Sequence, residues 1–307
     1  MLKKVVTAFL FMFLLGGALA YAQASNAKLE IVTTLFPTYD FAKQVGKDSV
    51  NVSLLLPPGV ESHTFEPKPQ DIVRINKADV FIYTGKFMEP WAEDMLKGVS
   101  NKNLIVVDAS KGIELAEEEG HDEEPEHHGG GKDPHIWLDL ANAQVMVNTI
   151  ARALVQKDPK NRVFYLNNAK EYNEKLADLD KRFKETLSTC KHKTIIYGGH
   201  FAFGYFAKRY GLEHVSPYDG FSPNAEPSPK AIVELINKLK GSGIKYIYFE
   251  ELLDPKVARV ISQETGAKLE LLHGAHNVSK DELSRGRTFI DIMENNLKKL
   301  RVGLECQ

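Results

Sequence analysis

The feature that most constrains the fold is a long, regular apolar pattern in the middle of the chain. Asp158 and Pro159 are residue types that favour the N-cap and the first turn of a helix. Apolar residues then recur every three or four positions, at Tyr165, Ala169, Tyr172, Leu176, Leu179, Phe183 and Leu187. This spacing predicts a helix of about 30 residues, about 45 Å long. We interpret it as a rigid strut between two lobes; the alternative is a long surface helix of one domain.

Both flanks of this helix alternate short apolar strands with helical patterns. The expected strands are residues 29–35, 50–56, 80–83 and 104–107 before the helix, and 193–197, 246–249 and 269–272 after it. This alternation predicts an α/β fold: two βα lobes with mainly parallel sheets, joined by one long rigid backbone helix. We place the N-terminal lobe at 25–158, the linking helix at 159–189 and the C-terminal lobe at 190–307. Such sheets bind ligands at the carboxyl ends of their strands.

The N-terminus has the pattern of a secretory signal. Lys3 and Lys4 precede an apolar run at 5–15, and small residues at every second position follow. We therefore predict a cleavable signal peptide at 1–24, with a permanent membrane anchor as the alternative. In a bacterium this signal leads to the periplasm, and we expect no lipid anchor because no cysteine lies near the cleavage site.

Charge and cysteine content say little about binding partners and leave the disulfide state open. The formal net charge is -2 and no basic stripe is present, so nothing favours a nucleic-acid partner. Cys190 and Cys306 are the two cysteines. In an oxidising compartment they form one disulfide or remain two thiols, and the sequence leaves both possibilities open.

Four histidines occupy similar places relative to the predicted strands. His63, His200 and His273 each follow a strand, and His135 lies at the end of an acidic segment. Neutral imidazole suits zinc, copper, iron or nickel, whereas manganese, magnesium and calcium prefer oxygen ligands. Three or four imidazoles without a cysteine are typical of tetrahedral zinc. We therefore predict a Zn²⁺ site in the interlobe cleft with these four histidines as ligands, and with Glu61 and His276 as the alternative ligands.

The acidic segment 114–132 contains three further histidines among many carboxylates, namely His121, His127 and His128. Such side chains bind divalent cations weakly and concentrate them. We interpret the segment as an accessory metal-collecting loop. The alternative is a solvated, disordered acidic run.

Three segments carry a family resemblance: 57–67 (PPGVESHTFEP), 133–139 (DPHIWLD) and 199–203 (GHFAF). They resemble the histidine motifs of the metal-binding periplasmic proteins of zinc and manganese ABC transporters, the cluster A-I solute-binding family. The resemblance covers essentially all of the mature chain, and the combined motifs are highly specific. It implies two βα lobes joined by a backbone helix, a metal ion between them, and delivery to a membrane permease. The His-rich loop before the second motif implies the zinc branch, which is ZnuA-like.

One segment departs from the family pattern. Many members place a carboxylate or a water at the fourth coordination position, where this chain has 272–276 (LHGAH). We take His273 as the fourth ligand because it ends the predicted strand. A histidine there also favours zinc, since manganese would need more oxygen ligands.

These observations together predict a monomeric, high-affinity zinc receptor that delivers Zn²⁺ to an ABC importer. The alternatives are a manganese or iron receptor of the same family, and a metal-sequestering protein or cell adhesin with the same fold. A secreted zinc hydrolase is disfavoured because the chain lacks a compact His-Glu-x-x-His signature, and four histidines leave no position for an activated water. We expect no enzyme activity and no catalytic residues.

Overall fold

The computed structural model describes residues 28–117, 131–218 and 226–307. The predicted signal peptide lies outside these residues, as do His121, His127 and His128 of the acidic segment. In the described parts of the chain, none of the helices combines the length and the apolar composition needed to cross a membrane.

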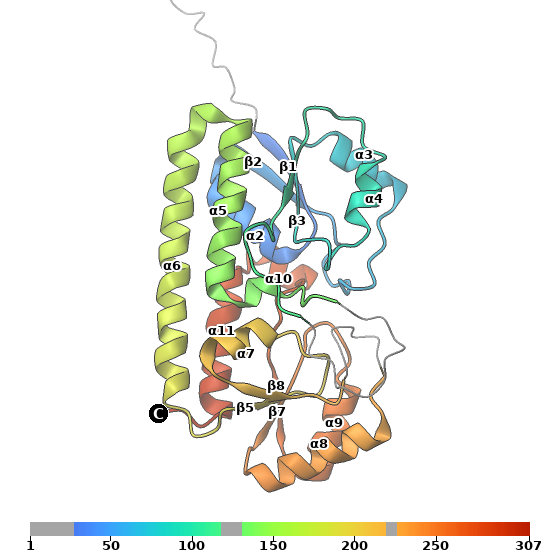
Figure 1. Cartoon of the computed structure of the whole chain (residues 1–307), viewed down its shortest axis with the longest axis vertical. Helices are drawn as coiled ribbons and strands as arrows, with labels where there is room; N and C mark the ends of the chain where they lie inside the picture. The colour runs from blue at the N-terminus through green and yellow to red at the C-terminus, as the bar shows by residue number, and fades with distance from the viewer. Residues whose placement is uncertain (1–27, 118–130, 219–225) are drawn as a thin grey trace, which may run out of the picture.

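The first half of the chain forms a four-stranded sheet, which lies at the top of Figure 1. Its strands are β1 (Leu29–Thr33), β2 (Val50–Leu54), β3 (Val80–Tyr83) and β4 (Ile105–Asp108). Every neighbouring pair is parallel and the order is β2-β1-β3-β4. All four residues of β3 are buried, as expected for a central strand that is covered on both faces.

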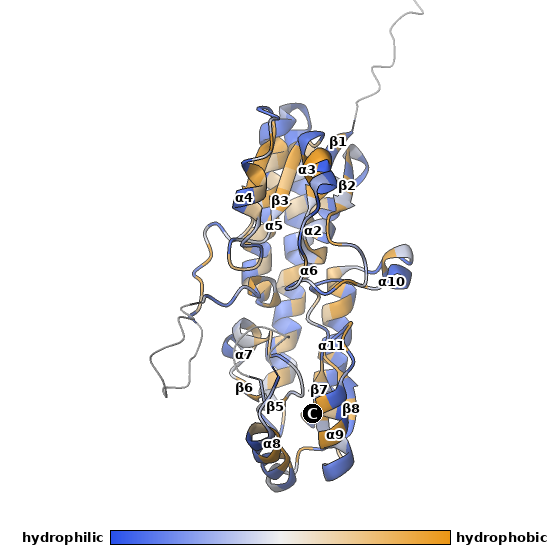
Figure 2. Ribbon diagram, turned by 90° about the vertical axis from the view of Figure 1, so that its right-hand side faces the viewer, coloured by the Kyte–Doolittle hydropathy of each residue, from blue (hydrophilic) through white to orange (hydrophobic). Residues whose placement is uncertain are grey.

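Helices cover both faces of this sheet. They are α2 (Phe36–Gly46), α3 (Pro69–Asn76), α4 (Ala92–Leu96) and α5 (Leu140–Lys157). Val80 and Ile82 pack with α2 and α5, whereas Phe81 and Tyr83 pack with α3 and α4. The strands around β3 are accordingly coloured as hydrophobic in Figure 2. The Phe36-Pro37 pair begins α2, since proline is favoured in a first helical turn.

The second half of the chain repeats this strand order. Its strands are β5 (Thr194–Ile196), β6 (Glu213–Val215), β7 (Tyr246–Phe249) and β8 (Lys268–Leu271). They form two parallel pairs, β5-β6 and β7-β8, which a parallel bridge between Tyr197 and Tyr248 connects. The strand β6 was not predicted from the sequence, because it has three residues and none of them is buried.

The helices of the second half are α7 (Gly204–Tyr210), α8 (Pro229–Ser242), α9 (Lys256–Thr265), α10 (Lys280–Ser284) and α11 (Phe289–Gly303). Three of them carry Ser or Thr N-caps, at Ser228, Ser279 and Thr288, whose hydroxyls accept backbone N–H groups of the first turn. Helix α10 has only five residues, and α7 begins without a side-chain cap.

The predicted long helix is confirmed. Helix α6 (Arg162–Ser188) has 27 residues, which gives about 40 Å, and a short turn at Pro159–Asn161 precedes it. It extends beside both sheets in Figure 1 and contacts α5 and α2 of the first half and α7 and α11 of the second. The fold is therefore the predicted α/β arrangement of parallel sheets with one long helix.

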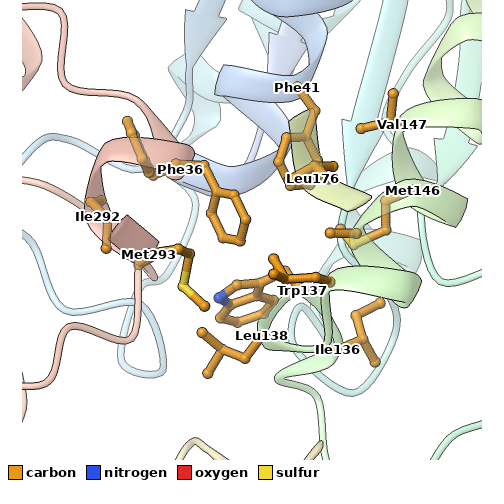
Figure 3. Packing of buried hydrophobic residues seen from close by; sticks show 14 of the residues in the cluster. Phe36, Phe41, Ile136, Trp137, Leu138, Met146, Val147, Leu176, Ile292 and Met293 are labelled. Carbon is orange, nitrogen blue, oxygen red and sulfur yellow. The ribbon is translucent and has the colours of Figure 1, made fainter. Parts of the chain in front are cut away.

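A continuous hydrophobic core connects the two halves. Trp137 is fully buried in it, and Figure 3 shows its indole beside Phe36, Leu138 and Met293. The buried carboxylate of Asp40 ties three helices together, because it accepts hydrogen bonds from the Tyr172 hydroxyl of α6 and from the Phe289 backbone N–H of α11. These contacts hold the two sheets in a fixed relation.

The two cysteines form a disulfide. Cys190 follows the end of α6 and Cys306 follows α11, so the bond ties the C-terminus to the long helix. The sequence had left this pairing open.

Candidate metal centre

Four histidines from four loops meet between the two sheets. They are His63, His135, His200 and His276. Each lies beyond the carboxyl end of a different parallel strand, namely β2, β4, β5 and β8. Because parallel strands present these ends at one edge, loops that are far apart in sequence bring their side chains to one place.

The geometry of the four rings is close to tetrahedral. All six distances between their ring centroids lie between 5.0 and 5.7 Å. The Nε2 atoms of His63 and His135 are 3.4 Å apart, and one nitrogen from each of the four rings lies within 4.8 Å of the others. A tetrahedral zinc ion with zinc–nitrogen bonds of about 2.0–2.1 Å needs nitrogens about 3.3 Å apart. The four rings fit such an ion.

Carboxylates fix the orientation of three of the rings. Asp133 Oδ1 lies 2.8 Å from His135 Nδ1, and Glu251 Oε1 lies 2.9 Å from His276 Nδ1. Glu250 is paired by distance with His200 Nδ1, and it accepts a hydrogen bond from the His200 backbone N–H at 3.3 Å. An Nδ1–H that donates to a carboxylate leaves the Nε2 lone pair for a metal, as in most histidine metal sites.

The Nε2 atoms of His200 and His276 are buried and have no hydrogen-bond partner among the described residues. A buried polar atom without a partner costs free energy, so its presence in a folded protein calls for a ligand. Both atoms belong to the four-histidine group, and a metal ion would satisfy both.

His63 differs from the other three because it is partly exposed. Its backbone N–H donates to Glu61 Oε1 at 2.8 Å, and the N–H of Thr64 donates to Glu61 Oε2 at 2.9 Å. Glu61, an alternative ligand in the sequence analysis, therefore holds the turn that carries His63 and is outside the histidine group.

Electrostatics keep two of the imidazoles neutral. Burial, followed by the nearby His276 and His200, lowers the pKa of His63 to about 2. Burial and the neighbouring histidines also hold the pKa of His135 well below its ordinary value. Burial opposes protonation of His276 too, but its hydrogen bond to Glu251 and the negative charge there raise its pKa. Neutral imidazole is the form that binds metal.

The structure brings the alternative residue His276 into the group with His63, His135 and His200, whereas the expected ligand His273 lies outside it. The backbone of His273 is fixed by Asn296, whose Oδ1 accepts from His273 N at 3.0 Å and whose Nδ2 donates to His273 O at 2.8 Å. The ring of His273 turns back to accept from the N–H of Ala275 at 2.9 Å. His273, at the end of the strand, therefore makes its hydrogen bonds within the local turn. His276, three positions later, reaches the other histidines.

Two supporting residues escaped the sequence analysis. Trp137 was taken only as an apolar residue, yet its indole packs edge-on against the rings of His135 and His276 and donates from Nε1 to Gly274 O at 2.7 Å. Asp133 was quoted within a motif without a role. Its position two residues before a candidate ligand was a signal, because an Asp can bond the backbone and ring of a residue two positions on.

Comparison with known proteins identifies similar chains. The family described as "ZnuA: Zinc-uptake complex component A periplasmic" matches residues 31–303. The high-affinity zinc uptake system protein ZnuA of Bacillus subtilis is 41% identical over 290 residues, which cover 92% of this chain and 90% of that protein.

Two further proteins are similar in sequence and structure. The zinc-binding lipoprotein AdcA of Streptococcus pneumoniae is 38% identical over 90% of this chain but only 56% of its own length. Its Zn(II)-bound ZnuA-like domain superposes with a TM-score of 0.77, at 36% identity, covering 91% of this chain and 99% of the domain.

The laminin-binding protein Lmb of Streptococcus agalactiae, described as having adhesin and metal-transporting activity, gives a TM-score of 0.80 at 30% identity, covering 90% of this chain and 99% of Lmb. AdcA is named a lipoprotein, which disagrees with our expectation of no lipid anchor on this chain.

Proposed function

Because the chain belongs to the family of periplasmic components of zinc-uptake complexes, we propose that it is a high-affinity receptor that captures Zn²⁺ and delivers it to an ABC importer. The observation that carries this proposal is the near-tetrahedral group of His63, His135, His200 and His276. Relatives named for zinc uptake and zinc binding support it. The family is one of solute-binding receptors and not a class of enzymes.

Zinc is the cargo that this ligand set favours. Four nitrogen ligands and a near-tetrahedral arrangement suit zinc, whereas manganese prefers oxygen ligands, and the nearby carboxylates are engaged with histidine Nδ1 atoms. A manganese receptor is the weaker alternative for this reason. An adhesin role is an alternative that the resemblance to Lmb keeps open, and zinc-limited growth of a deletion strain separates the two: only the importer role predicts rescue by excess zinc.

The residues around the four histidines prepare the site before zinc arrives. His135, His200 and His276 are almost completely buried and each is held by a carboxylate, so little reordering is needed when they bind. His63 is the most accessible of the four histidines. Zinc therefore enters the site from the side on which His63 lies. Asp133, Glu250 and Glu251 supply negative charge that balances the cation.

A transporter in the membrane is the partner that membership in a zinc-uptake complex implies. We propose that this partner is the permease of an ABC importer and that the receptor is a monomer in the periplasm. The three-part division at 25–158, 159–189 and 190–307 is proposed on the same basis, with α6 as the linking part.

Zinc titration of the purified protein tests the function and the ligand set together. We expect one tight site in the wild type, strongly weakened by His276→Ala and changed much less by His273→Ala. The reason is that His276 Nε2 faces the other ligands, whereas His273 Nδ1 accepts from the Ala275 backbone. Competition with a chromophoric chelator measures both affinities.

His273→Ala is the matched control for that comparison, since both residues are buried histidines of one turn. Absence of a tight zinc site in the wild type would contradict the proposed function. Equal losses in the two variants, or a larger loss in His273→Ala, would contradict the proposed ligand set alone.

Zinc affinity should also fall on acidification. The pKa of His276 is raised from its ordinary value of 6.5, so below that pKa the zinc-free protein holds a proton that zinc must displace. Displacing one proton weakens apparent affinity by about tenfold per pH unit below the pKa, and the loss disappears above it. Competition titrations between about pH 5.5 and 8 measure this slope. His276→Ala should show a slope smaller by one proton; parallel slopes would contradict the assignment.

A further inference from the structure

The carboxylate of Glu251 accepts hydrogen bonds from a single short turn. Its Oε2 accepts from the backbone N–H of Gly274 at 2.7 Å. Its Oε1 lies 3.2 Å from the backbone N of His276 and 2.9 Å from the Nδ1 of the same residue. Glu251 is only 8% exposed, so its carboxylate is buried. The hydrogen bonds that it accepts come from residues 274–276.

The turn that Glu251 holds is one that a chain rarely adopts without support. Ala275 has a φ of 59°, in the left-handed region that residues with a Cβ seldom occupy. Gly274 has no room for a side chain, since a Cβ there would lie 2.6 Å from the His276 ring. Conformations of this kind persist where surrounding contacts determine them, and here those contacts come from the Glu251 carboxylate and from Trp137.

Two histidines of this turn lie near different oxygens of the same carboxylate. His276 Nδ1 is within hydrogen-bond distance of Oε1, whereas His273 Nδ1 is 3.6 Å from Oε2 and accepts from Ala275. Glu251 thus hydrogen-bonds the ring of the histidine that joins the metal-binding group, and not the ring of the one that does not.

We propose that Glu251 is a positioning residue that makes His276, and not His273, the fourth zinc ligand. This inference rests on the proposed function. The carboxylate accepts the Nδ1–H of His276, which fixes the tautomer and directs Nε2 toward His63 and His135. The two backbone N–H groups that donate to it hold the turn in the form that brings His276 to that position.

The variant Glu251→Gln tests this role with little change in shape. The amide removes the negative charge and presents an NH₂ group toward donors that need an acceptor. We expect zinc affinity to fall about 10–100-fold, as is usual when a partner of a ligating histidine is lost. X-ray absorption should then count fewer imidazoles on the zinc than in the wild type. Glu270→Gln is the control, because it removes the same charge from the same lobe, where Glu270 pairs with Lys299 at 3.0 Å.

A double-mutant cycle separates positioning from general support of the fold. If Glu251 acts through His276, Glu251→Gln should change zinc affinity less than about twofold in a His276→Ala background. An equal loss in both backgrounds would overturn the inference, as would wild-type affinity and imidazole count in Glu251→Gln. If the wild type itself binds no zinc tightly, it is the proposed function that fails.

The wild-type protein provides a measurement that does not depend on the folding of any variant. In ¹⁵N spectra of histidine-labelled, zinc-loaded protein, the ring of His276 should be among those that show a metal-bound Nε2 and a slowly exchanging Nδ1–H. The signals of His273 should show no bound metal. Metal on His273, or on Nδ1 of His276, would overturn the inference.

Discussion

Replacing His135 by alanine is expected to weaken zinc binding by more than about 100-fold. Losing a residue that only hydrogen-bonds a metal ligand usually costs about 10–100-fold, and here a ligand itself is lost. His135 is fully buried, and its Nε2 lies 3.4 Å from that of His63. The change removes one of four ligands and also leaves the buried carboxylate of Asp133 without the ring Nδ1–H that it accepts. Competition with a chelator of known affinity measures the loss.

His192→Ala is the control for this substitution. His192 is mostly buried, but it lies beside Glu305, away from the four histidines. It should leave zinc affinity unchanged. A His135→Ala protein that retains its circular dichroism spectrum and its wild-type affinity would contradict the proposed site.

Removing the disulfide is expected to lower the free energy of unfolding by roughly 2–5 kcal/mol. Cys190 and Cys306 are 116 positions apart, so their bond closes a long loop and restricts the unfolded chain strongly. The variant Cys190→Ser/Cys306→Ser should therefore unfold at a lower urea concentration. Urea titration of the zinc-free protein, followed by circular dichroism, measures the change.

Wild-type protein in excess reductant provides the matched comparison, because it lacks the bond but keeps both sulfur atoms. The reduced wild type should unfold at the same urea concentration as the double variant. Coincident curves for oxidised wild type and double variant would contradict the expected stabilisation. Zinc affinity should stay the same in both, since Cys190 and Cys306 lie outside the four-histidine group.

Much of the fold was accessible from the sequence because its signals are local. The three- and four-residue spacing from Tyr165 to Leu187 predicted α6, and the apolar run of β3 predicted a central strand. Strand β6 was missed because it is three residues long and owes its pairing to β5, a contact that no local pattern encodes.

The candidate site was predicted in part, for a related physical reason. His63 and His200 follow predicted strands and His135 lies at the end of the acidic segment, and the structure brings these three together. The choice between His273 and His276 depends on which ring a buried carboxylate and a left-handed residue at Ala275 direct inward. Those are tertiary and backbone-dihedral effects, which the position of the nearest strand end does not encode.

The length of α6 limits how the zinc-loaded and zinc-free proteins can differ in shape. An unbroken helix that packs against both sheets resists bending, since a hinge would have to break its backbone hydrogen bonds or repack its buried face. We therefore expect the distance between the two sheets to change little when zinc binds. We therefore expect a transporter to distinguish the zinc-loaded from the zinc-free receptor by direct contact with the loops that carry the histidines. Among the four, His63 is the most exposed.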